Sequence, residues 1–267
     1  MSIHRGPALP SPRALAGARG FTIVELMVAM ALGLVIVLVI AQVFVSSKQS
    51  YTTTEEMSRL QEDARYGLGQ MSRVVRMAGY ISNPLDAANL ATIYPSTARA
   101  IDGAEGAAGA NDTLTVRFQG SGATADGSVL DCVGNEIAAG NKAVNYYYIA
   151  TGANGHSSLF CDNTGTVGPA TTGPVELVPN VEAMQILYGV DTDGDYAANY
   201  YVTRDLVANP DQIVSARIGI LFASNDFVAS ALDTSSHSVL DASTAAPNDR
   251  RLRRVYTTTV TLRNRTQ

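Results

Sequence analysis

A long apolar run near the N-terminus dominates the hydrophobic pattern of this chain. Residues 21–45 read FTIVELMVAMALGLVIVLVIAQVFV, and Glu25 is the one carboxylate among these 25 residues. About 20 apolar residues are enough to cross the hydrocarbon core of a bilayer as an α-helix. A carboxylate inside such a helix costs roughly 2.5–3.5 kcal/mol on insertion scales, so it is normally paired or functional. The pattern therefore predicts a membrane-spanning helix in which Glu25 has a partner.

A second helical pattern follows directly and contains no proline before Pro84. Its apolar residues recur at steps of three and four, which places them on one face of an α-helix. They are Met57, Leu60, Ala64, Leu68, Met71, Val75 and Ala78. On the polar side, Arg59 has the i,i+4 spacing for ion pairs with Glu55 and Asp63. We therefore predict that an amphipathic helix continues the apolar one.

Together the two patterns predict a single helix over residues 21–80. Gly79 is suited to the C-cap, because glycine readily adopts the left-handed conformation that ends many helices. At 1.5 Å per residue, a helix of this length measures about 85–90 Å. Glycine weakens a helix interior, so Gly33, Gly67 and Gly69 are the expected soft points.

Beyond residue 80 the pattern changes to short runs of β-branched and aromatic residues separated by small and polar ones. The predicted strands are 112–118, 143–150, 185–191, 199–203, 213–224 and 254–264. The predicted loops are 98–111, 119–128, 162–174 and 229–249. This organisation predicts an α+β fold, in which the second half of the long N-terminal helix packs on an antiparallel sheet.

Charge indicates which end of the chain is exported. The first 20 residues contain Arg5, Arg13 and Arg19 and no acidic residue. Positive charge before the apolar run predicts that this leader stays in the cytoplasm and that the C-terminal side is exported. Removing the leader would change the net charge from −5 to −8, because it takes three of the 19 basic residues and none of the 24 acidic ones. So acidic a chain has no global attraction to nucleic acid or to anionic lipid.

The chain has two cysteines, Cys132 and Cys161. In an exported protein an even pair predicts a disulfide, whereas in a cytosolic protein the two would be free thiols. The disulfide would close a loop of about 30 residues and contribute roughly 3–4 kcal/mol in the chain-entropy model.

The flanks of the apolar run resemble a known processing site. The block Gly20-Phe21-Thr22-Ile23-Val24-Glu25 is similar to the GF(T/S)xxE site of type IV prepilins and pseudopilins. The resemblance implies cleavage after Gly20 by a prepilin peptidase, N-methylation of Phe21, and pairing of Glu25 with the terminal amine of a neighbouring subunit. A secretory signal peptide would instead lose its apolar core and show a small-x-small cleavage site after it.

Three later segments resemble the PilW family of type IV pilus minor pilins. They are RLQEDARYGLGQMSRVVRMAGY at 59–80, MQILYGVDTDGD at 184–195 and TTTVTLRNR at 257–265. Many members of that family have a cysteine just after the A-G-Y motif, but here Ile81-Ser82-Asn83-Pro84 stands in its place. A family disulfide that uses that position is therefore not expected.

The resemblance implies a type IV pilin-like fold and an architectural function. Residues 1–20 would be the leader, 21–45 the transmembrane and filament-core half of the helix, 46–80 its amphipathic half, and 81–267 a periplasmic α+β head. The protein would sit in the inner membrane with its head in the periplasm. It would then join other minor pilins in a complex that primes type IV pilus assembly and lies near the pilus tip, at the cell surface.

The partners implied are the other minor pilins, the major pilin, the prepilin peptidase and the inner-membrane assembly platform. One alternative is a minor pseudopilin of a type II secretion system, which shares the helix and the cleavage chemistry. A second alternative is a membrane-anchored periplasmic binding domain outside any filament. The sequence does not identify whether the pilus would serve motility, adhesion or DNA uptake.

Three alternating aspartates, Asp191, Asp193 and Asp195, invite comparison with a calcium loop. An EF-hand loop has glycine at position 6 and glutamate at position 12, where this chain has Tyr196 and Val202. The pattern therefore favours a tight hairpin turn in which aspartates bind backbone N–H groups. Calcium binding by the three carboxylates is the alternative, and no other cofactor is expected.

The remaining polar motifs do not predict catalysis or nucleic-acid binding. The basic run Arg250, Arg251, Arg253 and Arg254 has no interleaved aromatics for base stacking and is typical of a solvated loop. There is no HExxH, no GxSxG and no glycine-rich phosphate loop. We therefore expect no catalytic residues, no enzyme activity and no nucleic-acid partner.

Overall fold

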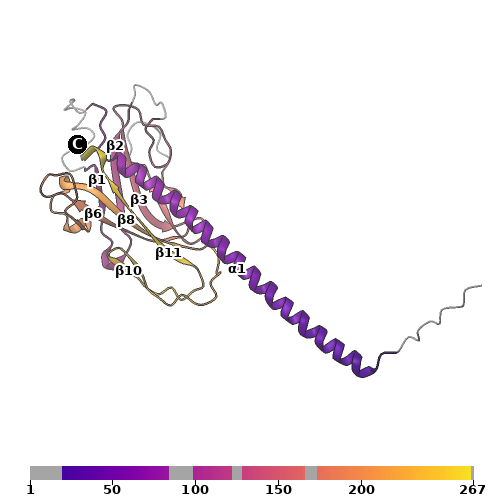
Figure 1. Ribbon diagram of the computed structural model, residues 1–267. Coiled ribbons are helices and arrows are strands. Elements are labelled where there is room, and N and C mark those ends of the chain that lie inside the picture. The colour runs from indigo at the N-terminus through magenta and orange to yellow at the C-terminus, as the bar shows by residue number, and fades with distance from the viewer. Residues whose placement is uncertain (1–19, 84–98, 122–127, 166–172, 266–267) are drawn as a thin grey trace, which may run out of the picture. The chain divides into compact units, whose positions relative to one another are not determined.

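The computed structural model describes residues 20–83, 99–121, 128–165 and 173–265 (Figure 1). The leader arginines and Pro84, on which predictions were made above, lie outside the described residues. The chain divides into two compact units, residues 1–50 and residues 51–267.

One helix, α1 (Ile23–Met77), contains both hydrophobic patterns. The predicted helix therefore exists, and its ends lie within three residues of the predicted ones. It is helical throughout its 55 residues, so none of the three expected soft points interrupts it. It ends where Gly79 adopts φ of +78°. The side-chain amide of Asn264 donates to the carbonyls of Met77 (3.3 Å) and Ala78 (3.1 Å), which satisfies acceptors that a helix end leaves unpaired.

The first unit contains the apolar half of α1. Its large hydrophobic side chains are exposed, with exposed fractions between 52% for Val28 and 89% for Phe21. By length and composition alone, α1 is apolar enough near the N-terminus to cross a membrane. A helix that is apolar on all sides and not covered by its own chain fits a lipid or helix-bundle environment.

The second unit contains two large antiparallel sheets and a small one. The first sheet has the order β1-β2-β3-β4-β5, with β1 (Ile101–Ala104), β2 (Thr113–Gln119), β3 (Lys142–Thr151), β4 (Ser157–Asp162) and β5 (Val175–Val178). The second has the order β11-β8-β6-β7, with β6 (Val181–Val190), β7 (Tyr200–Val202), β8 (Ile213–Ala223) and β11 (Arg253–Thr261). Strands β9 (His237–Val239) and β10 (Ala242–Thr244) pair with each other. Four single-turn 3₁₀ helices are η1 (Ala107–Gly109), η2 (Arg204–Leu206), η3 (Pro210–Gln212) and η4 (Arg263–Arg265).

All six predicted strands are present, as β2, β3, β6, β7, β8 and β11. The prediction of loops at 98–111 and 229–249 was wrong in part, because β1 lies in the first and β9 and β10 lie in the second. These three strands have only three or four residues each, too few to show an alternating pattern. Strands β4 and β5 were also missed.

The second half of α1 packs into the core between these strands. Its buried residues include Leu60, Ala64, Met71, Val74 and Val75. Gly67 is buried as well, and a Cβ on it would lie 3.0 Å from Cγ2 of Val178 and 3.8 Å from the ring of Phe222. Gly67 is therefore a contact point with β5 and β8, which corrects its predicted role as a soft point.

Two details of the predicted helix face were wrong. Met57 and Leu68 are only partly buried, whereas Glu56 is 5% exposed. The predicted ion pair of Arg59 with Glu55 is confirmed (2.7 Å), but its second ion pair is with Glu56 (3.3 Å), where Asp63 was predicted. The carboxylate of Glu56 accepts a hydrogen bond from the backbone N–H of Asn225 (3.0 Å), which explains how its charge is accommodated inside the fold.

Candidate functional site

The start of α1 is fixed by a capping box, whose Thr-x-x-Glu pattern is present in the sequence. Thr22 precedes the helix, and its side-chain oxygen accepts a hydrogen bond from the backbone N–H of Glu25 (3.2 Å). In return, Oε2 of Glu25 accepts hydrogen bonds from the backbone N–H (2.9 Å) and the hydroxyl (3.0 Å) of Thr22. This reciprocal Thr-x-x-Glu arrangement satisfies N–H groups that have no partner within the helix. The box was not predicted from the sequence, although the Thr-x-x-Glu spacing is its signature.

The capping box places the predicted processing residues in a defined position. Gly20 and Phe21 directly precede the capped turn, outside the helix, and both are exposed. The hydrogen bonds from Thr22 use one carboxylate oxygen of Glu25, Oε2. The structure thus gives Glu25 a local partner within its own chain, where the sequence predicted a partner on another subunit.

Cys132 and Cys161 form a disulfide, with their Cα atoms 6.3 Å apart and a sequence separation of 29. Cys161 lies on β4 opposite Tyr147 of β3, and both are fully buried. The loop that carries Cys132 is held by the buried side chain of Asn145, whose Oδ1 accepts from the Cys132 N–H (2.7 Å). The bridge therefore attaches the loop after β2 to the first sheet.

The three aspartates lie in the turn between β6 and β7. Asp191 accepts hydrogen bonds from the N–H groups of Asp193 (3.1 Å), Gly194 (2.7 Å) and Tyr196 (2.9 Å). Gly194 and Tyr196 both have positive φ, at 80° and 65°, so the turn reverses tightly. Both oxygens of Asp191 take part, and such bonds from an aspartate to nearby backbone N–H groups are typical of a turn.

The same three carboxylates offer oxygens within 4.8 Å of one another, and Asp193 and Asp195 are exposed. Calcium takes six to eight oxygen ligands. The carboxylate of Asp191 already accepts hydrogen bonds from three backbone N–H groups, so less of it is left to bind a cation. The three aspartates therefore suit a structural turn better than a calcium site.

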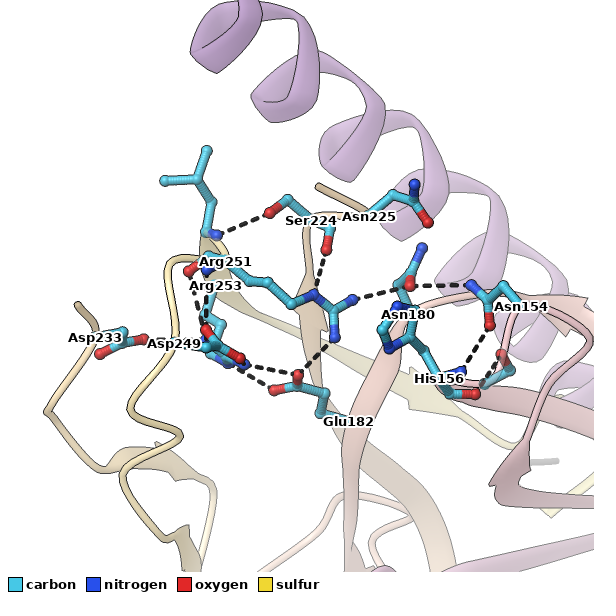
Figure 2. A network of polar contacts seen from close by, with 12 residues as sticks. Asn154, His156, Asn180, Glu182, Ser224, Asn225, Asp233, Asp249, Arg251 and Arg253 are labelled. Atoms are coloured by element: carbon cyan, nitrogen blue, oxygen red, sulfur yellow. Dashed lines mark hydrogen bonds and ion pairs between the residues drawn. The ribbon is translucent and has the colours of Figure 1, made fainter. Parts of the chain in front are cut away.

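The basic run at residues 250–254 differs most from its predicted role. Arg250 and Arg254 are exposed, as expected of a solvated loop. The guanidinium of Arg253, however, is 2% exposed and forms two bidentate ion pairs (Figure 2). One is with Glu182 (2.7 and 2.9 Å) and the other with Asp249 (2.6 and 2.8 Å). The alternation along β11 therefore buries one arginine and exposes the next.

Arg251 extends this network toward the first sheet. Its guanidinium contacts Oε1 of Glu182 (3.2 Å) and Oδ1 of Asn180 (2.8 Å), and its Nε donates to the carbonyl of Ser224. Asn180 in turn accepts from the side chain of Asn154, in the turn between β3 and β4 (3.1 Å, Figure 2). Arg251 and Arg253 thus connect the two sheets inside the second unit. In sequence these arginines resemble a binding patch, but in the fold their role is structural.

The two histidines of the described chain show no catalytic arrangement. The ring of His237 contacts Asp233 (2.7 Å), which also lies 3.6 Å from Arg253 at the edge of the same network. His156 takes part through its backbone, since its N–H donates to Asn154 (2.9 Å). Neither imidazole is set beside a serine or cysteine nucleophile in these contacts.

Two family models match the chain. The model described as "Type IV Pilus-assembly protein W" covers residues 146–264, from within β3 to the end of β11 and the residues that follow it. The model described as "Prokaryotic N-terminal methylation motif" covers residues 15–41, which include Gly20, Phe21 and Glu25.

Among solved structures, a type IV-like pilin from Thermus thermophilus aligns with 16% sequence identity and a TM-score of 0.46. The alignment covers 78% of this chain and 100% of that chain. No curated protein sequence matches the chain.

Proposed function

We propose that this chain, which matches the PilW family model over residues 146–264 and the N-terminal methylation motif over residues 15–41, acts as a minor pilin of the type IV pilin class. The observation that carries the proposal is the order of its parts. An N-terminal methylation motif is followed by an exposed apolar helix, and that helix continues into a unit of antiparallel sheets. Such a chain can be held in a membrane by one end and can present its other end to neighbours.

Processing would use the two residues that precede the helix. Cleavage between Gly20 and Phe21 requires a peptide bond that an enzyme can reach, and both residues lie outside α1. After N-methylation, Phe21 would carry an ammonium group close to the first helical turn. In lipid or in a dry bundle, an ammonium is the natural partner of a carboxylate such as Glu25.

Glu25 would then have two successive tasks. Its Oε2 caps its own helix through Thr22, and its carboxylate would pair with the Phe21 amine of a neighbouring subunit during assembly. The pairing fixes the axial register of two apolar helices, which packing alone specifies weakly. The protein would thus join other minor pilins and the major pilin at the inner-membrane platform and reach the cell surface at the pilus tip. Its task is architectural, without enzyme chemistry.

A strain deleted for this gene tests the proposal directly. Sheared surface pilin and secreted exoprotein activity are measured in the same culture. We expect lost surface pilin with normal secretion, because a priming subunit is needed to start the filament. Normal pili with blocked secretion would overturn the pilus role and favour a pseudopilin. Unchanged pili and unchanged secretion would favour a membrane-anchored domain outside any filament, and mass spectrometry would then find the leader still attached.

Two substitutions at Glu25 separate capping from subunit pairing. Glu25→Gln retains an acceptor for the Thr22 N–H, as capping boxes allow, but removes the charge. Glu25→Ala removes both functions. We expect both variants to be cleaved and methylated yet to fail in surface assembly, as read by mass spectrometry of the mature terminus and by immunoblot. Normal assembly of Glu25→Gln with failure of Glu25→Ala would show that capping matters and pairing does not.

The turn of three aspartates is assigned a structural role and is expected to need no cation. Thermal melts of the purified mature chain with millimolar calcium and with a chelator should coincide. A clear rise of the melting temperature in calcium, lost in Asp193→Asn, would reverse this assignment, because a ligand that binds only the folded state stabilises it.

A further inference from the structure

A groove in the second unit has a basic helix as one wall and a β-strand as the other. It encloses about 790 Å³ between the second half of α1 and the middle of β11. The helix wall presents Arg65, Arg73 and Arg76, all exposed, and the strand wall presents Tyr256, Thr257 and Thr258. Arg263 completes the lining, which includes no acidic residue. The groove is therefore positively charged on a chain whose net charge is −5.

Strand β11 forms an edge of the second sheet, because β8 is its one neighbour in the strand order. Its register with β8 runs without interruption from Arg253↔Ala223 to Thr261↔Ser215. Just beyond the two ends, the Ser224 N–H donates to the Leu252 carbonyl (2.8 Å) and the Leu262 N–H donates to the Val214 carbonyl (2.8 Å). Both contacts involve even-numbered residues of the C-terminal segment.

This parity shows which backbone groups of β11 have no partner. In an antiparallel pair, hydrogen-bonded and non-hydrogen-bonded residues alternate. The even-numbered residues of β11 therefore bond to β8, and Val255, Thr257 and Thr259 direct their N–H and C=O groups to the open side. Outside the strand ladders, no backbone hydrogen bond within the described ranges is made to these three residues. A nine-residue strand edge of this kind is a template for another strand.

We propose that this groove binds an extended acidic segment of a partner subunit, which adds to the second sheet as a strand beside β11. Backbone hydrogen bonds to the odd-numbered residues of β11 would provide the affinity, as in other cases of β-strand addition. Carboxylates of the segment would pair with the arginines of α1 and select an acidic sequence, since Arg binds carboxylates in a bidentate manner.

The dimensions of the two walls agree with this occupant. Arg65 and Arg76 are separated by about 16 Å along the helix axis at 1.5 Å per residue. An extended segment covers that length with about five residues at roughly 3.3 Å each. The arginine nearest the middle, Arg73, is partly engaged already, with Gln70 (3.1 Å) and the Asp131 carbonyl (3.4 Å). Arg65 and Arg76 form no ion pair with any other residue in the described part of the chain, so both guanidinium groups are available to a ligand.

The alternation of backbone groups along β11 allows a specific test, because a substitution at an odd-numbered residue changes only the open side. Thr257→Pro removes an N–H that faces the open side and leaves the β8 ladder intact, which an edge strand tolerates. Thr257→Ala is the matched control, because it removes the side chain and retains the N–H. The third variant, Arg73→Glu with Arg76→Glu, reverses the charge of the helix wall. Each is made in the full mature chain in detergent, and circular dichroism with thermal melts verifies folding.

The probe is a fluorescent six-residue peptide that alternates Glu and Val, and binding is measured by fluorescence anisotropy. We expect the Glu peptide to bind at least tenfold more tightly than Gln and Lys versions. Thr257→Pro and the double Arg variant should each weaken it at least tenfold, and Thr257→Ala should leave it unchanged.

Equal binding of the Glu and Gln peptides would overturn the proposal, as would equal affinities of Thr257→Pro and Thr257→Ala. Displacement of the peptide by inorganic phosphate at low concentration would identify an anion site instead of a strand site. This proposal rests on the proposed function for the source of the segment, but the peptide assay uses no pili. A failed peptide assay with lost pili in the deletion strain would refute the groove alone, and the converse would refute the pilus role alone.

Discussion

Arg253 shows how strongly a single side chain can depend on its two neighbours. Its guanidinium is 2% exposed and lies between the carboxylates of Glu182 and Asp249. Removing one partner of a buried pair costs about 3–5 kcal/mol when the other charge is left without compensation. Glu182 keeps its contact with Arg251 (3.2 Å), so we expect Arg253→Ala to lower the free energy of unfolding by about 3 kcal/mol, the lower end of this range, as measured by urea denaturation of the mature chain in detergent.

The adjacent Arg254 provides the control for that experiment. It is exposed, so Arg254→Ala should change the free energy of unfolding by no more than about 0.5 kcal/mol. Equal costs for the two arginine variants would contradict the network.

The hydrogen bond from Arg253 lowers the pKa of Asp249 to about 2. The stability that this pair contributes is therefore present above the ordinary aspartate pKa of 3.8 and is lost as the pH falls toward 2.

Glu105 carries the opposite kind of perturbation. Burial, with the nearby charges of Asp112, Asp241 and Asp205, raises its pKa from 4.5 to about 7. The folded state thus holds a proton that the unfolded state releases, so the protein loses stability as the pH rises from about 4.5 to 7. Glu105→Gln, which cannot ionise, should be more stable than the wild type at pH 8 and equal to it near pH 4.5.

Melting temperatures at the two pH values check this expectation. The difference between variant and wild type must grow with pH, because the substitution removes a charge that exists only at the higher pH. A difference that is the same at pH 4.5 and pH 8 would mean that the pKa of Glu105 is not raised by folding.

At the scale of elements, sequence reasoning succeeded where a pattern was long and failed where it was short. The helix and six strands follow from long periodicities or from dense runs of β-branched and aromatic residues, and such a run predicted even the three-residue β7. Strands β1, β9 and β10 have three or four residues and neither signal. The roles of Glu56 and Arg253 were not predictable for another reason. Their partners, Asn225 and Glu182, are distant in sequence and are brought near only by the fold.

Two glycines of α1 test how the helix docks on the sheets. A Cβ on Gly69 would meet nothing within 4 Å, whereas one on Gly67 would lie 3.0 Å from Val178. Alanine stabilises a helix interior by about 1 kcal/mol relative to glycine. We expect Gly69→Ala to gain close to this amount and Gly67→Ala to gain less or to lose stability. Urea denaturation measures both, and equal gains would mean that α1 is not closely packed at Gly67.

At the scale of the whole molecule, the disulfide is the main covalent constraint on the second unit. It closes a loop across 29 positions, so the chain-entropy model assigns it roughly 3–4 kcal/mol. We expect Cys132→Ser with Cys161→Ser to lose this amount of stability, and a reducing agent to produce the same loss in the wild type. The reducing agent should leave the double variant unchanged. A wild type that melts at the same temperature with and without it would show that the bridge contributes little.

The capping box at the start of α1 also bears on the proposed maturation. Its participants, Thr22 and Glu25, both lie C-terminal to the bond between Gly20 and Phe21. The proposed cleavage would therefore break none of the capping-box hydrogen bonds, and the new terminus would need no refolding before it met another subunit. Precursor and product would share one helix start, so the cut would act as an unmasking step: it would add a charge at the end of a helix that is already capped.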